Sequence, residues 1–419
     1  MKPINLLDGE ALVKTFKHGA GRVATPARTL ARLASSLSPM GITRVANVTG
    51  LDKIGIPVVM VCRPNSRSLA VFQGKGVELD AARVSGLMEA IETYHGETIL
   101  DPLKFASYKQ MLDRHVVLDC HSLPLSAGGY FHHHRPMHWI EGYDLVQRRA
   151  VWVPYEVVHT DYSSCAPPAS GCFRLSTNGL ASGNHLLEAI SQGLYEVIER
   201  DATTLWNFLD QRGRQETEID LDSVDDALCV TQIQRCVKAG LEVRIWDAST
   251  DIRVPVFVAE LRETSASKGA VWASAAFGSG CYCSRQIALL RALTEAAQAR
   301  TTFISGARDD MSWDDYESAD QEHLALRTGH TDEPEYRCFS ATESWPTETL
   351  QEDIQHAADR LAAVGLEQII VVDLTQSRFG IPVVRVIVPG LEGPDEYFSD
   401  FVPGLRARNR YAGRAEGSP

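Results

Sequence analysis

Three segments of the chain repeat one pattern, and this repetition limits the folds that the sequence can adopt. They read VANVTGLDKIGIPVVMVC (45–62), IWDASTDIRVPVFVAEL (245–261) and VVDLTQSRFGIPVVRVIV (371–388). Each has a β-branched run, a polar turn containing Thr, and a second apolar run that opens with Ile/Val-Pro-Val. Proline is tolerated at the start of a strand, where no ladder donor is needed, so each segment predicts a β-hairpin. Three copies favour one architecture built from similar units over a string of unrelated domains.

Helical patterns follow glycine-containing loops. They cover residues 82–97 after the loop 73–76, residues 184–209 after the loop 176–183, and residues 287–300 after the loop 277–280. Two further amphipathic helices are expected at 221–239 and 349–365. The sequence therefore predicts an α/β (α+β) fold of repeated β-hairpin and helix units. We expect one catalytic domain over 21–405, an N-terminal extension (1–20) and a C-terminal tail (406–419) that is polar and disordered.

The composition narrows the range of functions. A net charge of −13 over 419 residues argues against a nonspecific nucleic-acid binder. It does not argue against nucleotides that arrive with Mg²⁺, because the metal supplies positive charge. The N-terminus has no apolar stretch long enough for a signal peptide, and the longest apolar runs are too short to span a membrane. Nine scattered cysteines fit a reducing compartment, so we expect a cytoplasmic protein.

Two groups of residues resemble metal ligands at first sight. Cys281 and Cys283 form one close pair, but no second pair completes a zinc site. The simpler interpretation is two small residues that lead into a helix. His132, His133 and His134, with His138 nearby, precede an Arg-Pro step that indicates a loop, and three adjacent imidazoles cannot all face one ion from a regular element. Neither group is favoured as a metal site, and the role of both stays open.

A repeated octet points to a different kind of site. SGLMEAIE (85–92) and QGLYEVIE (192–199) both carry two glutamates at the same spacing. In the first octet Ser85, Glu89 and Glu92 lie at i, i+4 and i+7, within a stripe roughly 60° wide on a helix. Similar stripes recur on the other two long helices. Their members are Asn184, Glu188 and Glu199 with Glu196 beside them, and Arg291, Glu295 and Gln298.

Most glutamates on amphipathic helices are solvated and lie near a basic residue four positions away. Glu196 with Arg200 fits that interpretation, as does Arg291 with Glu295. The first helix does not, because Arg83 is the only Lys or Arg between Gly76 and Leu103. Two carboxylates on one stripe repel each other unless they face solvent or a cation. With Lys75 between two glycines, the parts of a Mg²⁺–nucleotide site are present.

At these residues the chain resembles the YcaO family of ATP-dependent enzymes that modify peptide backbones. The resemblance runs from about residue 21 to 405. Its most specific parts are Gly74-Lys75-Gly76, Ser85-x-x-x-Glu89-x-x-Glu92, Asn184-x-x-x-Glu188 continuing to Glu196-x-x-Glu199-Arg200, and the stretch from Leu290 to Glu295. It implies ATP and Mg²⁺ as cofactors, without a phosphate-loop or kinase motif.

The resemblance also implies roles for individual residues. The carboxylates that would hold Mg²⁺ and the phosphates are Glu89, Glu92, Glu188, Glu196 and Glu199. The residues that would contact ATP are Lys75, Ser85, Asn184, Arg200 and Arg291. The family uses a basic and a hydroxyl residue seven positions apart near the N-terminus, and Arg22 and Thr29 have that spacing.

Within the family, RPNSRSLAVFQGKG (63–76) and VPGLEGP (388–394) resemble the branch encoded beside TfuA-type partner proteins. That branch is associated with thioamidation, in which sulfur replaces a backbone amide oxygen. The implied chemistry is addition of a sulfur nucleophile to the carbonyl, phosphorylation of the resulting oxyanion by ATP, and loss of phosphate.

Two alternatives remain. The first is an azoline-forming cyclodehydratase of Cys, Ser or Thr, whose relatives commonly end in a Pro-rich tail, whereas this chain ends in RAEGSP. The second is a non-catalytic module that docks a precursor peptide. The partners implied are a precursor peptide and a TfuA-like protein, with a homodimer left open and no nucleic acid or membrane.

Overall fold

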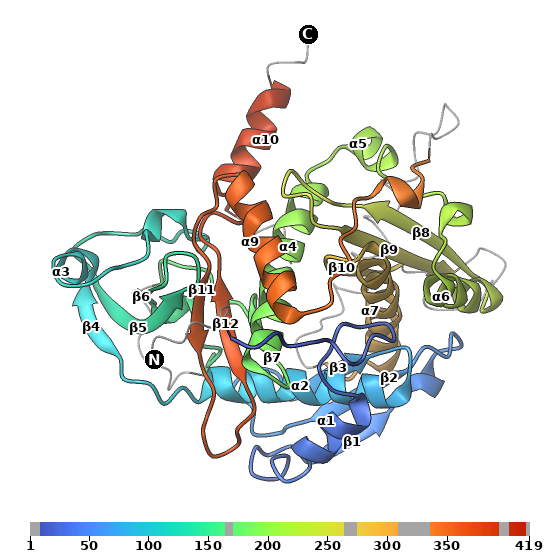
Figure 1. Ribbon diagram of the computed structural model, residues 1–419, viewed down its shortest axis with the longest axis horizontal. Coiled ribbons are helices and arrows are strands. Elements are labelled where there is room, and N and C mark those ends of the chain that lie inside the picture. Colours follow the sequence, from blue (N-terminus) through green and yellow to red (C-terminus); the bar gives the residue numbers. More distant parts are fainter. Residues whose placement is uncertain (1–8, 164–170, 264–274, 309–335, 394–401, 416–419) are drawn as a thin grey trace.

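The computed structural model describes residues 9–163, 171–263, 275–308, 336–393 and 402–415. Within them the strands form three antiparallel sheets, and one long helix packs on each sheet (Figure 1). The first 8 residues, the last residue of the VPGLEGP stretch and the final residues 416–419 lie outside this description.

The first sheet has the order β1-β2-β3 and carries helix α2. These elements are β1 (Arg44–Asn47), β2 (Val58–Cys62), β3 (Val71–Lys75) and α2 (Leu79–Glu97). A side chain at Gly74 of β3 could not be accommodated, because its Cβ would lie 2.1 Å from Ala82 O and from Gly86 N of the helix. Glycine therefore lets α2 lie directly against the strand that precedes it.

The second sheet repeats this arrangement with the order β10-β9-β8 and helix α7. Its elements are β8 (Leu241–Asp247), β9 (Val256–Glu263), β10 (Ala276–Cys281) and α7 (Arg285–Ser305). A Cβ at Gly280 would lie 2.2 Å from Ala288 O of α7. The glycine-rich strand before each helix thus has the same packing role in both units.

The third sheet has the order β4-β5-β11-β12-β7, with β6 paired to β5. Its elements are β4 (Lys104–Ser107), β5 (Pro136–Asp144), β6 (Arg149–Pro154), β7 (Leu180–Ser182), β11 (Ile370–Asp373) and β12 (Val383–Ile387). Helix α4 (Leu186–Asn207) packs on β7 and β12. The three predicted hairpins are confirmed as the antiparallel pairs β1–β2, β8–β9 and β11–β12.

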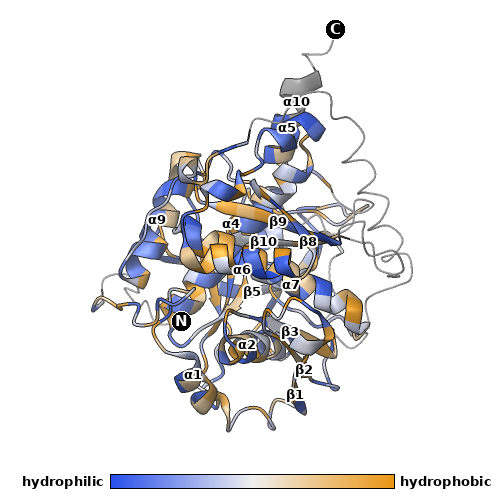
Figure 2. Cartoon of the chain, turned by 90° about the vertical axis from the view of Figure 1, so that its right-hand side faces the viewer, coloured by the Kyte–Doolittle hydropathy of each residue, from blue (hydrophilic) through white to orange (hydrophobic). Residues whose placement is uncertain are grey.

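Shorter helices complete the described part of the fold. They are α1 (Pro26–Leu33), α3 (Tyr108–Leu112), α5 (Gln211–Gln215), α6 (Ala227–Lys238), α9 (Leu350–Ala363) and α10 (Leu405–Ala415). Figure 2 shows β9 in the colours of hydrophobic residues inside the molecule, while α5 at the surface is hydrophilic. None of the described helices is both long and apolar enough to cross a membrane.

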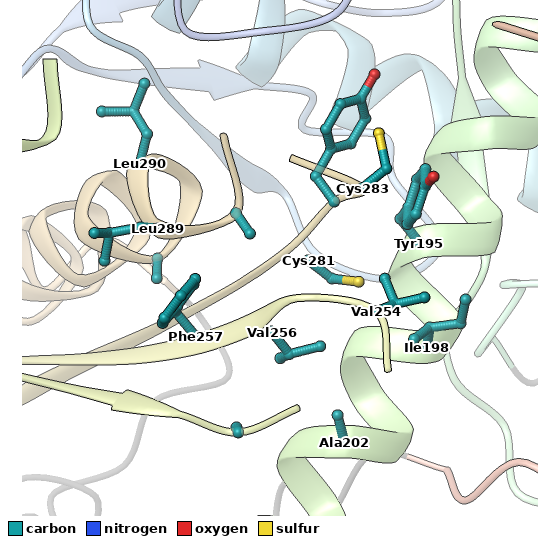
Figure 3. Packing of buried hydrophobic residues seen from close by; sticks show 14 of the residues in the cluster. Tyr195, Ile198, Ala202, Val254, Val256, Phe257, Cys281, Cys283, Leu289 and Leu290 are labelled. Carbon is teal, nitrogen blue, oxygen red and sulfur yellow. The ribbon is translucent and has the colours of Figure 1, made fainter. Parts of the chain in front are cut away.

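Side chains from two of the units meet in one hydrophobic cluster. Tyr195 and Ile198 of α4 lie beside Val254 and Cys281, which belong to the second unit (Figure 3). Cys281 and Cys283 are both buried in this cluster. Their burial agrees with the interpretation of two small residues before a helix.

Several predicted boundaries were wrong for local reasons. All three loops predicted before the long helices contain strand residues: 73–76 includes the end of β3, 277–280 lies within β10, and 176–183 contains β7, which pairs with β12. The helix predicted at 221–239 begins at Ala227, because the Asp226 carboxylate accepts from the amides of Leu228 and Cys229 and caps it there. The long helix predicted from 184 begins at Leu186, so Asn184 precedes it.

The prediction of a disordered C-terminal tail was also wrong, because its described part is helix α10. Arg406 at the start of α10 pairs with the fully buried Asp201 and with Asp251. The Glu392 carboxylate accepts from the amides of Gly404 and Ala407 at the same helix end. A buried ion pair and satisfied amides fix this helix start to the rest of the chain.

Candidate functional site

Each of the three long helices presents a glutamate to a backbone amide that lies 16 or 17 residues earlier in the chain. The donor and acceptor pairs are Gln73 N with Glu89 at 3.2 Å, Gly179 N with Glu196 at 3.3 Å, and Ser279 N with Glu295 at 3.4 Å. The three units therefore resemble one another in the position of a carboxylate as well as in their packing.

The units are also joined to one another through these helices. Ser182 of β7 donates its amide and its hydroxyl to Glu92 of α2, at 2.8 and 2.6 Å. Ser279 Oγ of β10 donates to Glu199 of α4 at 2.7 Å. Lys75 of β3 forms an ion pair with Glu295 of α7. Contacts thus run from α2 to the α4 unit, on to the α7 unit and back to β3, so the carboxylates lie where the three units meet.

The electrostatics of this cluster reflect a shortage of positive charge. Burial raises the pKa of Glu92 to about 8, and repulsion by Glu196 and Glu89 adds to the rise. Burial also raises the pKa of Glu196 to about 7, although Arg200 opposes the shift. The Glu89 side chain is open to solvent in the site, yet the protein around it reduces its hydration and raises its pKa to about 6. A bound cation would stabilise the ionised forms of all three.

Glu295, which the sequence predicted to be a surface residue paired with Arg291, behaves differently from the other glutamates. Its burial alone would raise its pKa, but Lys75, Arg200 and Arg291 hold the pKa down to about 2. Glu295 is therefore ionised at neutral pH and paired with Lys75. This ion pair, not the predicted surface pair with Arg291, is what the structure shows for Glu295.

A pocket that is partly open to solvent lies beside Glu188, one of the clustered carboxylates. The N-terminal residues 19–22 line one side of it, and Glu188, Gln192 and Arg291 line another. Gln192 Oε1 accepts from Arg22 at 3.0 Å and from Arg291 at 3.1 Å. Two guanidinium groups and buried polar side chains at one pocket suit an anionic, polar ligand.

Arg22 and Thr29 lie with the other predicted nucleotide-contacting residues. Thr29 Oγ1 donates to Asn184 Oδ1 at 3.0 Å, and the Asn184 amide groups donate to Glu188 Oε1 at 3.1 Å. Arg22 approaches the same Glu188 carboxylate at 3.7 Å. The two N-terminal residues thus join the pocket through Asn184 and Glu188, more than 150 positions away in sequence.

Gln192 is a pocket residue that the sequence analysis missed, although the octets contained the signal. It opens the second octet at the place that Ser85 holds in the first, four residues before the glutamate that accepts from a backbone amide earlier in the chain. Arg291 holds that place before Glu295. Ser85 itself is half-buried on α2. Arg200, also half-buried, acts electrostatically on both Glu196 and Glu295.

The residues present fit a magnesium ion that arrives with a nucleotide. In the part of the chain that the structure describes, no three His, Cys, Asp or Glu side chains form a group that could hold a metal by themselves. Mg²⁺ usually takes only one or two carboxylates and completes its shell with water and phosphate oxygens. Among the described residues, Glu199 Oε2 and Arg291 Nε are buried without a hydrogen-bond partner, which suits a cation and an anion respectively.

The histidine-rich loop lies away from this cluster. His121 and His133 face each other with their Nε2 atoms 2.9 Å apart, and both are exposed. His132 accepts from the amide of His134 at 3.2 Å. With no described third ligand near them, these contacts give no support to a metal site in the loop.

Comparison with known proteins bears directly on this site. The model of a family described as YcaO cyclodehydratase, ATP- and Mg²⁺-binding, matches residues 73–392. A protein of Rhizobium leguminosarum bv. trifolii, described by its position in the tfuA 3′ region, is 38% identical over 376 residues, which cover 88% of each chain. An uncharacterised protein of Methanothermobacter thermautotrophicus is 35% identical over 375 residues, which cover 88% of this chain and 94% of that one.

The fold is shared by solved structures of other proteins. A heterocyclase in complex with substrate and cofactor superposes with a TM-score of 0.76 at 22% identity over 92% of this chain, which spans only 54% of the heterocyclase. A YcaO protein of Methanopyrus kandleri bound with AMPPCP and Mg²⁺ superposes with a TM-score of 0.71 at 23% identity, covering 91% of this chain and 95% of that one.

Proposed function

Because this chain belongs to the YcaO family of ATP-dependent, Mg²⁺-binding enzymes that modify peptides, we propose that it converts a backbone amide of a ribosomally made peptide into a thioamide. The observation that carries the choice of product is the similarity to the protein of the tfuA 3′ region over 88% of the chain. The stretches 63–76 and 388–394 resemble the same branch. The proposed catalytic domain is 21–405.

In this proposal the polar pocket binds the nucleotide. Arg22, Arg291 and Gln192, which are joined by hydrogen bonds, would contact the nucleotide, and Thr29 and Asn184 would hold Glu188 in place. Lys75 and Arg200 lie next to the carboxylate cluster and would supply positive charge to the phosphates. Glu89, Glu92, Glu188, Glu196 and Glu199 would hold the magnesium ions, and Ser85 lies at the position that corresponds to Gln192.

When bound, Mg–ATP supplies the phosphoryl group that turns an amide oxygen into a leaving group. The chain contributes position and charge. Helices α2, α4 and α7 hold carboxylates and basic groups in fixed places, because each is packed on its own sheet and each is joined to the next unit. This chemistry needs no nucleophile from the protein, because the nucleophile is either an external sulfur donor or the substrate.

Azoline formation is the second candidate, because the matching family model is described as a cyclodehydratase. The two reactions share the nucleotide site and differ in the origin of the nucleophile. A thioamide takes sulfur from outside the peptide, whereas an azoline forms from the side chain of the following Cys, Ser or Thr. None of the glutamates can therefore distinguish them.

A substrate variant distinguishes these two reactions. If the residue that follows the modified amide is changed from Cys, Ser or Thr to Ala, the peptide should still react in the presence of sulfide and ATP. The product should gain the mass difference between sulfur and oxygen, as read by mass spectrometry. Loss of all modification in the Ala peptide, with nucleotide binding intact, would favour the azoline reaction instead.

A further inference from the structure

The N-terminal segment 12–23, here called the strap, forms part of the pocket wall although it was predicted to begin as a polar extension. Its first residues pair with the entry to α9, since Lys14 N donates to Glu348 O at 2.9 Å and Leu350 N donates to Leu12 O at 3.1 Å. Figure 1 shows the dark blue N-terminal chain passing beside α9. Phe16 and Arg22 then exchange two backbone hydrogen bonds of 2.9 Å, which close a tight hairpin.

The C-terminal end of the strap contacts residues of the pocket. The Val23 amide donates to Glu188 Oε2 at 3.0 Å, and the Arg22 guanidinium contacts Gln192 and Glu188. The hairpin tip, residues 19–22, lines the pocket together with Tyr282 of the second unit. A side chain at Gly21 would bring a Cβ to 2.2 Å from the Tyr282 hydroxyl, so the strap lies tightly against that ring.

A buried ion pair fixes the near end of the strap. Lys14 Nζ lies 2.9 Å from Asp353 Oδ1, with 4% and 0% of the two side chains exposed. The same ammonium donates to Thr347 Oγ1 at 2.6 Å, and the Tyr282 hydroxyl donates to Asp353 Oδ2 at 2.7 Å. Tyr282 therefore contacts Asp353 of this ion pair and also lines the pocket.

A buried pair of this kind adds little net stability, but losing one partner leaves an uncompensated charge in the interior. The Lys14–Asp353 ion pair also fixes the position of the strap. We propose that Lys14 and Asp353 are positioning residues for nucleotide binding, because their ion pair holds the strap so that Arg22 and the hairpin tip form the pocket wall. This inference rests on the proposed function of the pocket.

The strap offers its own matched control. Lys17 also pairs with a glutamate near α9, Glu348, but both side chains are more than half exposed, at 52% and 71%. Lys14→Met should let the strap detach for most of the time and weaken the binding of Mg–AMPPCP about tenfold or more. Lys17→Met should bind Mg–AMPPCP within about twofold of the wild type, because exposed pairs contribute little. Calorimetry on the full chain measures both.

Two further measurements show whether a weaker affinity comes from a displaced strap or from a less stable fold. Hydrogen exchange at the amides of Lys14, Phe16 and Arg22 should be faster in Lys14→Met and slow again at saturating Mg–AMPPCP. The double variant Lys14→Met/Asp353→Asn has no unpaired buried charge, so its melting temperature should recover while its affinity stays weak.

The outcomes that overturn the inference are distinct. Wild-type affinity in Lys14→Met, an equal loss in Lys17→Met, or an affinity that recovers together with stability in the double variant would each remove the positioning role. If the wild-type chain itself binds no Mg–AMPPCP, the proposed function of the pocket fails and the inference fails with it.

Discussion

Replacing Glu92 by Gln should abolish turnover and at the same time stabilise the nucleotide-free protein. The amide keeps an oxygen that can accept from Ser182 N and Oγ, so the local hydrogen bonds survive. It removes a carboxylate that the proposed mechanism needs beside the magnesium ions. Gain of stability with loss of activity is the pattern expected at a functional site, and a merely structural Glu92 would not give it.

The direction of the stability change follows from the pKa of Glu92. Its folded value, about 8, lies above the ordinary value of 4.5, mainly because of burial. The folded state therefore binds more protons than the unfolded state between these values, and stability falls as the pH rises through that window. Glutamine does not ionise and so avoids this loss. At pH of about 8 we expect Glu92→Gln to raise the free energy of unfolding by about 1–2 kcal/mol, a value reduced to allow for solvent in the site.

Thermal unfolding at pH of about 6 and about 8, with turnover measured alongside, checks this expectation. The gain from Glu92→Gln should be larger at the higher pH. Asp80→Asn is the control on the same helix, since Asp80 forms a surface pair with Arg83, and it should change neither quantity much. Unimpaired turnover in Glu92→Gln, or a large loss of stability, would show that Glu92 is structural.

Nucleotide binding should require Mg²⁺ and should strengthen as the pH rises from about 6 to about 8. Glu89, Glu196 and Glu92 have pKa values near 6, 7 and 8, so at neutral pH part of the cluster is protonated. Binding that needs ionised carboxylates must expel those protons, and each proton released can contribute up to about tenfold in affinity per pH unit.

Calorimetry with AMPPCP, in buffers that differ in ionisation enthalpy, measures both the affinity and the number of protons released. We expect strong binding with Mg²⁺, proton release on binding, and little or no binding in excess chelator. Equal affinity with and without chelator would contradict the account, because the clustered carboxylates would otherwise repel the phosphates.

The sequence contained enough local information to predict the fold class, the family and the main elements. The hairpins were predicted because Pro and β-branched residues mark strand starts, and α2 and α4 because their glutamates follow a helical period. Membership of the YcaO family and similarity to its TfuA-associated branch are confirmed. The roles of the site residues remain predictions that rest on the family resemblance and on the geometry of the cluster.

What the sequence could not supply is the set of contacts between units. No pattern in the sequence marks Ser182 or Ser279. Their positions on β7 and β10 place their hydroxyl groups within hydrogen-bond distance of Glu92 and Glu199, respectively. Lys14 and Asp353 are 339 positions apart, and no local pattern links them. The sequence predicted that Glu295 pairs with Arg291 on the helix surface. In the fold Lys75, from a distant strand, forms an ion pair with Glu295 instead.

We propose that the carboxylates of α2 and α4, together with the polar pocket, support ATP-dependent modification of a peptide backbone with sulfur. The most direct test is the intact mass of a candidate precursor peptide co-expressed with this chain, with and without a TfuA-like partner, and with Glu92→Gln in place of the wild type. We expect a gain equal to the replacement of one oxygen by sulfur, at full yield only with the partner, and no gain with Glu92→Gln. A peptide that loses one water would contradict thioamidation, and an unchanged mass with the active chain and partner would contradict the account as a whole.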